Sequence, residues 1–171
     1  MYHAKNDGRN CFHYYTEELD EIAHRKNADH NELKRVISGR LFWLAYQPIV
    51  DAVSGRTVAM EALLRLPGRL AAHSVDYVIG LAQEIGLLPD LGTWVVRQAC
   101  AQLRQWRDEG LPPLRVCINT CAEELRDADY QQHLDLVLSE SGLSAQDIEI
   151  ELTERDAIEL ERSGSNIIFR L

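Results

Sequence analysis

The sequence predicts an α/β protein with a mainly parallel sheet or barrel, and three observations support this fold class. From residue 41 onward, apolar segments with strand character alternate with segments whose apolar residues follow helical spacing. The 171 residues, 46% of them hydrophobic and 26% charged, are enough to bury a core. The chain has no run of 18 apolar residues and no signal-like amino terminus, so we expect a cytoplasmic protein with no membrane segment.

The first 40 residues differ from the rest, because they are rich in charged side chains and contain no proline. Their apolar residues follow helical spacing only loosely. We expect a polar helical connector that begins near Thr16, ends near Gly39 and takes no part in the core. His24 and His30 are then solvated residues of this connector.

Four segments have strand character: residues 42–50, 57–66, 114–119 and 148–152. Pro48 cannot donate to a strand ladder, so the first strand should lie at an edge or at a break in pairing. In the second strand, Glu61 and Arg65 share a face opposite an apolar face. Such polar groups on a buried strand point to a site, and the alternative is a structural Glu–Arg pair at a strand end.

The segments between these strands predict helices. One spans residues 75–85, and a second runs from about Asp90, as N-cap, to Gly110. A helical region precedes Gly142, and another helix begins near Glu154. Trp94 and Trp106, in the second helix, are interpreted as core anchors.

The charge is unevenly distributed. The net charge is −9, and residues 121–171 carry 13 acidic and 4 basic side chains, which accounts for the whole excess. An acidic segment repels duplex nucleic acid but suits divalent cations, and the alternative is a solvated acidic surface. The four cysteines lack zinc-finger spacing and are interpreted as reduced packing residues.

Three oxygen-bearing side chains stand at or near the ends of successive predicted strands: Glu61, Asn119 and Glu151. The carboxyl ends of parallel strands converge at one mouth, where ligands bind. Two carboxylates and an amide oxygen are hard ligands that suit Mg²⁺, Mn²⁺ or Ca²⁺. By spacing alone the metal site is one interpretation, because any acidic α/β protein offers carboxylates near strand ends.

The sequence also resembles the EAL domain family. Five blocks in the order and spacing of that family carry the resemblance: Tyr46–Asp51 (YQPIVD), Glu61–Arg65 (EALLR), Leu81–Leu88 (LAQEIGLL), Val116–Asn119 (VCIN) and Ile150–Glu154 (IELTE). Residues 1–15 resemble the end of a GGDEF domain and residues 16–40 the helical linker between the two domains. Residues 41–171 then resemble the first part of an EAL domain.

This resemblance implies hydrolysis of cyclic di-GMP to pGpG, with Mg²⁺ or Mn²⁺, on a TIM-type barrel whose first strand is antiparallel. It implies that Glu61, Asn119 and Glu151 are metal ligands, with Glu61 and Glu151 part of the catalytic site. Gln47 and Arg65 correspond to substrate contacts. Glu154 corresponds to a catalytic-site glutamate that holds a loop over the metal.

The chain departs from the family in several respects. It contains about four of the eight strands, and lacks the later Asp-Asp pair and catalytic lysine. Cys121 stands where the family usually has serine. We therefore expect a fragment that is inactive alone; the alternative is a degenerate, non-catalytic module that binds a ligand or a protein partner. An open half-barrel should also expose the edge of its last strand to a second copy, unless residues 165–171 cover it.

Overall fold

The computed structural model describes residues 17–162. Its helices are α2 (Glu17–Ser38), η1 (Gly68–Ala72), α3 (Val75–Glu84), α4 (Leu88–Asp108), α5 (Ala122–Arg126), α6 (Ala128–Ser141), η2 (Ala145–Asp147) and α7 (Glu154–Arg162). Its strands are β1 (Trp43–Val50), β2 (Thr57–Arg65), β3 (Arg115–Asn119) and β4 (Ile148–Glu151). The predicted GGDEF remnant (1–15) and the predicted edge cover (165–171) lie outside the described residues.

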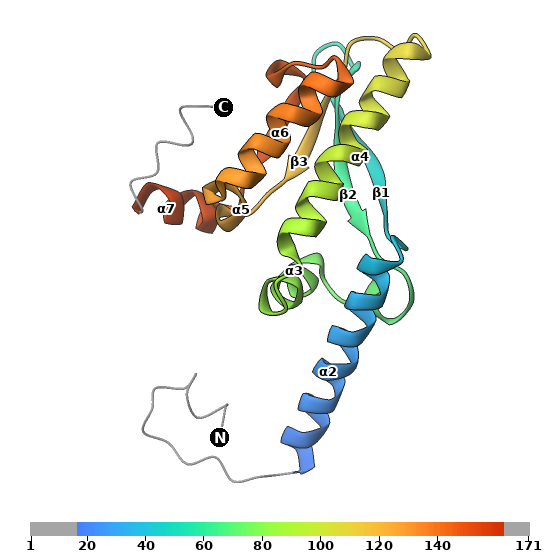
Figure 1. Ribbon diagram of the computed structural model, residues 1–171. Coiled ribbons are helices and arrows are strands. Elements are labelled where there is room, and N and C mark those ends of the chain that lie inside the picture. The colour runs from blue at the N-terminus through green and yellow to red at the C-terminus, as the bar shows by residue number, and fades with distance from the viewer. Residues whose placement is uncertain (1–16, 163–171) are drawn as a thin grey trace.

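The four strands form one sheet in the order β1-β2-β3-β4, as expected for a partial barrel (Figure 1). β1 pairs antiparallel with β2, whereas the β2–β3 and β3–β4 pairs are parallel. Pro48 lies opposite Met60 on the edge strand β1, which confirms the placement that its missing N–H required. Within residues 17–162, β1 and β4 are thus the two edges of an open sheet.

The strand register sorts side chains onto two faces. Ala62 lies level with Ile118, and Ile118 with Ile150, on the face that packs against helices. One position earlier, Glu61 is level with Cys117. Because successive side chains alternate across a strand, the polar groups belong to the opposite face. This face carries Glu61, Asn119 and Glu151 of the candidate site.

The larger core lies between the sheet and helices α4 and α6, which run side by side over one face (Figure 1). Val96, Cys100 and Leu103 of α4 are fully buried in it. The Trp106 ring meets Tyr46 edge to face, with centroids 4.9 Å apart, and Trp94 contacts Phe42 at 4.2 Å. Both tryptophans thus act as core anchors, as predicted.

A second core corrects the interpretation of the connector helix. Leu33 and Val36 of α2 have no exposed surface, so α2 packs into a cluster with η1, α3 and the first turn of α4. Its outward residues are charged, and for this reason the apolar stripe is too narrow to stand out in the sequence. His30 contacts Glu84 of α3 at 3.2 Å instead of facing only solvent.

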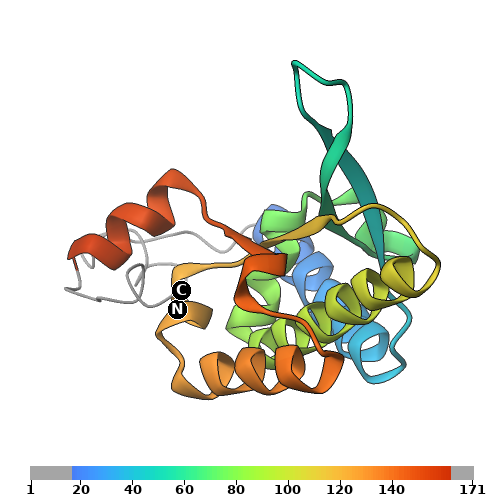
Figure 2. The same cartoon turned by 90° about the horizontal axis from the view of Figure 1, so that it is seen from above.

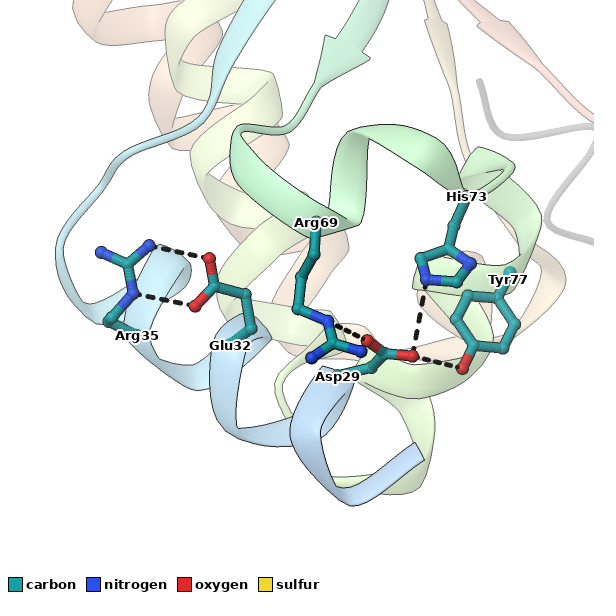
Figure 3. A network of polar contacts seen from close by, with 6 residues as sticks. All are labelled: Asp29, Glu32, Arg35, Arg69, His73 and Tyr77. Carbon is teal, nitrogen blue, oxygen red and sulfur yellow. Dashed lines mark hydrogen bonds and ion pairs between the residues drawn. The ribbon is translucent and has the colours of Figure 1, made fainter. Parts of the chain in front are cut away.

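A buried carboxylate reinforces this packing (Figure 3). Asp29 of α2 has a side chain only 3% exposed. Its Oδ2 accepts a hydrogen bond from the Tyr77 hydroxyl at 3.0 Å and lies 3.5 Å from Nε2 of His73. Arg69 places Nε 2.8 Å from Oδ1 as an ion pair whose geometry is not that of a hydrogen bond. These contacts join α2 to both η1 and α3.

Two further details concern element limits. α4 begins at Leu88, two residues before the expected N-cap Asp90, because Pro89 fits the first turn, where its missing N–H costs nothing. The turn between β1 and β2 projects from the body of the molecule (Figure 2), and Val53 at its tip is 96% exposed. Across residues 17–162, every helix is too short or too polar to cross a bilayer.

Candidate metal-binding site

The three predicted metal ligands line one cavity of about 350 Å³, whose other lining residues come mainly from β2, β3 and helices α3, α4 and α5. Asn119 and Glu151 are the last residues of β3 and β4 and lie level with each other. Glu61, predicted to stand at or near a strand end, lies in the middle of β2, level with Cys117. β2 extends past the end of its pairing with β3, and Glu61 therefore lies inside β2 and not at its end.

The Asn119 side chain reaches Glu61 although Glu61 is level with Cys117, two positions before Asn119 on β3. Its Nδ2 donates a hydrogen bond to Oε1 of Glu61 at 2.9 Å. The amide is thereby fixed with its oxygen available as a ligand, beside two carboxylates. Such a set of hard oxygen donors fits Mg²⁺, Mn²⁺ or Ca²⁺ and does not fit a thiolate-seeking metal.

The candidate ligand set contains only two carboxylates, those of Glu61 and Glu151. In residues 17–162, no three His, Cys, Asp or Glu side chains cluster as a metal site. The set therefore depends on the Asn119 amide and on the two glutamates. It fits a divalent ion that keeps several water ligands, as Mg²⁺ usually does.

Cys117 lies on the same face, level with Glu61 and Glu149. The sequence predicts packing roles for the cysteines but does not place Cys117 beside the candidate site. Burial, together with a hydrogen bond to Glu151 and the nearby Glu149 charge, raises the pKa of its thiol to about 12. The thiol therefore stays protonated and serves as a small packing group and donor, not as a nucleophile. The position of Cys117 beside Glu61 follows from the pairing of β2 with β3. This pairing joins residues distant in the sequence, so the local pattern did not indicate it.

A second missed group supports the loop that follows Asn119. Glu124 of α5 is buried, and its Oε2 accepts hydrogen bonds from the Cys121 backbone N–H at 3.1 Å and from its thiol at 3.3 Å. Burial raises the pKa of Glu124, and the charges of Glu123 and Asp156 act in the same direction, whereas the hydrogen bonds from Cys121 oppose them. Cys121 thus takes the N-cap position of α5.

The other predicted site residues lie outside the lining of this cavity. Gln47 of β1 is level with Glu61 in the ladder. Arg65 ends β2, where its Nη1 donates to the Leu64 carbonyl oxygen at 3.0 Å. Glu154 opens α7, directly after the loop that follows Glu151. Their predicted roles in substrate contact and in the catalytic loop stay predictions.

The strand order, with an antiparallel first strand and Glu61, Asn119 and Glu151 lining one cavity, defines the protein as a partial β/α barrel with a candidate site beside its parallel strands. The chain belongs to the EAL domain family, whose model matches residues 30–170. The match begins inside α2, consistent with the burial of that helix in the second core.

The chain is also similar in sequence to named proteins. The chain is 32% identical over 158 residues to the cyclic di-GMP phosphodiesterase NbdA of Pseudomonas aeruginosa, covering 90% of this chain and 20% of that protein. It is 32% identical over 170 residues to the cyclic di-GMP phosphodiesterase PdeR of Escherichia coli, covering 98% and 25%. The chain thus spans about a fifth to a quarter of the length of these relatives.

Solved structures agree on the fold. The PaMucR phosphodiesterase in its c-di-GMP complex superposes with a TM-score of 0.74 at 27% identity, covering 84% of this chain and 58% of that one. The FimX EAL domain of Xanthomonas citri, also in complex with c-di-GMP, gives a TM-score of 0.72 at 19% identity, covering 87% and 58%. The latter likeness concerns the fold alone.

Proposed function

We propose that this chain supplies the first metal-binding strands of an EAL-type phosphodiesterase that hydrolyses cyclic di-GMP to pGpG. The observation that carries the proposal is the meeting of Glu61, Asn119 and Glu151 in one cavity. Further support comes from the names of NbdA and PdeR and from the c-di-GMP complex of the PaMucR phosphodiesterase.

The proposed ion is Mg²⁺ or Mn²⁺, held by the carboxylates of Glu61 and Glu151 and by the amide oxygen of Asn119. When bound, the ion supplies Lewis acidity toward a phosphoryl oxygen and a water ligand. Without it, two carboxylates at the mouth repel a substrate that carries two phosphodiester charges.

The remaining predicted residues act on the substrate and on the loop. Arg65 presents a planar fork of donors that matches a phosphate or a guanine edge, and we propose that it orients the dinucleotide together with Gln47. Glu154 follows β4 by three positions, and we propose that it holds the loop beside the metal site. Holding the loop keeps the reacting phosphate and the ion in one geometry.

The test measures binding and turnover separately on the full chain. Calorimetry follows c-di-GMP binding with Mn²⁺, with Mg²⁺ and with EDTA, and chromatography follows the formation of pGpG. Glu61→Gln should weaken Mn²⁺-dependent binding by at least about tenfold, as loss of a ligand does. Arg65→Ala should weaken c-di-GMP binding but not Mn²⁺ binding. Glu161→Gln, an exposed carboxylate of α7, is the matched control.

The outcomes separate the two functions considered. Metal-dependent formation of pGpG that Glu61→Gln abolishes supports hydrolysis. Metal-dependent binding of c-di-GMP without pGpG is the result expected of a fragment that is inactive alone, whereas metal-independent binding without pGpG would assign the chain to the non-catalytic alternative. Binding that ignores EDTA and Glu61→Gln would overturn the metal site itself.

We also propose that the open sheet edges favour self-association. Among the described residues, β1 is an edge strand that contains Pro48, whereas β4 contains no proline, so the β4 edge, although short, is the better pairing surface. Light scattering should find dimers or larger species at micromolar concentration. A monomer at every concentration would contradict this proposal.

A further inference from the structure

Asp156 links the ends of the two parallel strands that carry Asn119 and Glu151. In α7 it forms a local pair with Thr153: its backbone N–H donates to Thr153 Oγ1 at 3.2 Å, and its Oδ2 accepts from that hydroxyl at 2.5 Å. These two contacts by themselves describe a residue that caps the start of a helix. A helix cap alone requires no more.

The second carboxylate oxygen of Asp156 serves a different element. Oδ1 accepts a hydrogen bond from the backbone N–H of Ala122 at 3.3 Å. Ala122 is the first residue of α5 and is 2% exposed, so its amide is one of the groups that a helix start leaves without an intrahelical partner. This hydrogen bond is not needed to cap α7. It joins α7 to the start of α5, so Asp156 has a structural role outside its own helix.

The linked segments flank the proposed metal ligands. Thr153 follows Glu151 by two positions, and Ala122 follows Asn119 by three. A backbone hydrogen bond from Thr120 to the carbonyl oxygen of Glu151, at 3.0 Å, already joins the same two strand ends. The Asp156 side chain adds a second link between the segments that follow these strands, through its hydrogen bond to Ala122. Asp156 also lines the same cavity as Asn119 and Glu151.

We propose that Asp156 is a positioning residue that fixes the spacing between Asn119 and Glu151, so that both face one ion. The inference rests on the proposed function, because the metal gives the spacing its purpose. Both oxygens of Asp156 already accept hydrogen bonds, which favours a positioning role over direct ligation. The side chain acts through the two loops and does not touch the substrate.

Three variants separate the contributions. Asp156→Ala removes the side-chain hydrogen bonds to Ala122 and to Thr153. Asp156→Asn keeps one acceptor oxygen and the same shape but loses the charge. Glu161→Ala removes a carboxylate from the exposed side of the same helix, and it controls for the charge of α7. Thermal unfolding of each variant shows whether the fold persists.

The experiment combines Mn²⁺ titration by electron paramagnetic resonance with amide hydrogen exchange on the full chain. We expect Asp156→Ala to weaken Mn²⁺ binding about tenfold or more, the usual effect of losing an outer partner of a metal ligand. Asp156→Asn should recover part of the affinity, and Glu161→Ala should match the unmodified chain. Exchange should accelerate at the amides of Ala122 and Thr120 in Asp156→Ala alone.

The results are decisive in each case. Unchanged Mn²⁺ affinity in a folded Asp156→Ala variant overturns the proposal, even where the Ala122 amide becomes exposed. If the unmodified chain binds no Mn²⁺, the proposed function fails, and hydrogen exchange then decides the linkage alone. Faster exchange at the Thr120 amide in Asp156→Ala would support the link that Asp156 makes between the two strand ends. Unchanged exchange at this amide would contradict that link.

Discussion

A carboxylate oxygen of Glu124 occupies the space that a side chain at Gly92 would need. A Cβ built on Gly92 would overlap Oε1 of Glu124 and would also come within 3.2 Å of the Tyr130 ring. The Glu124 side chain thus fills the space beside α4 at Gly92, and any larger residue there would have to displace it. The carboxylate in turn caps α5 through Cys121, next to the loop that carries Asn119.

Gly92→Ala should therefore destabilise the protein by about 1–3 kcal/mol, the usual cost of overpacking a filled interior. Glu124 would have to leave the Cys121 amide to make room. Chemical denaturation measures the loss. In a Glu124→Ala background, the same glycine substitution should cost clearly less, and equal costs in both backgrounds would contradict the proposed overlap.

The burial of Glu124 predicts a pH dependence of stability. Its pKa is raised in the folded protein above the value of an unfolded chain. Its favourable contribution is therefore complete below the unfolded pKa of about 4.3 and is lost as the pH rises through the raised folded value. Glu124→Gln stays neutral, so its stability relative to the unmodified chain should rise with pH over this window. Denaturation from pH 4.5 to 8 measures it, with the exposed Glu161→Gln as control.

Asn119→Asp tests whether the cavity holds a cation. The new carboxylate would lie beside Glu61, where the amide now donates at 2.9 Å, and two like charges at that distance repel. In EDTA the variant should melt several degrees lower than the unmodified chain. Mn²⁺ should restore most of the difference by neutralising the charges. A melting temperature that does not respond to Mn²⁺ would argue against an ion at this position.

The Asp29 contacts predict that α2 contributes to stability through polar groups as well as through Leu33. Asp29→Ala would leave the Tyr77 hydroxyl without its acceptor and Arg69 without its ion-pair partner, at a cost of about 1–3 kcal/mol. Tyr77→Phe removes one hydrogen bond and should cost about 1 kcal/mol. Arg25→Ala is the control, because its pair with Glu21 is exposed. Thermal unfolding compares the three variants.

The strand pattern was readable from the sequence because alternation and apolar runs are local features. The same holds for the antiparallel first strand, since Pro48 restricts where β1 can pair, and family resemblance gave its direction. The depth of Glu61 in β2 was not readable, because it depends on how far β2 extends beyond β3. The packing of α2 was not evident either, because its partners are distant in the sequence: Arg69 and Tyr77, for example, lie 40 or more residues away from Asp29.

The site shows the same division. Carboxylates near strand ends could be listed from spacing, and Asn119 joined them because it ends a predicted strand. Cys117 and Glu124 were missed because their importance comes from pairing and from burial, and neither leaves a mark in the local pattern. Gln47, Arg65 and Glu154 rest on the resemblance to the family.

The sharing of α4 between the two hydrophobic clusters has a consequence for how the molecule opens. Leu88 and Leu91 belong to the cluster with α2, whereas Val96 and Leu103 belong to the cluster with the sheet. Stability in such an arrangement is distributed unevenly along the chain, in cooperative units that open separately. The amides of α2 and α3 should then exchange with solvent through a partial opening that leaves the sheet intact, while the middle of α4 exchanges only when the whole molecule unfolds.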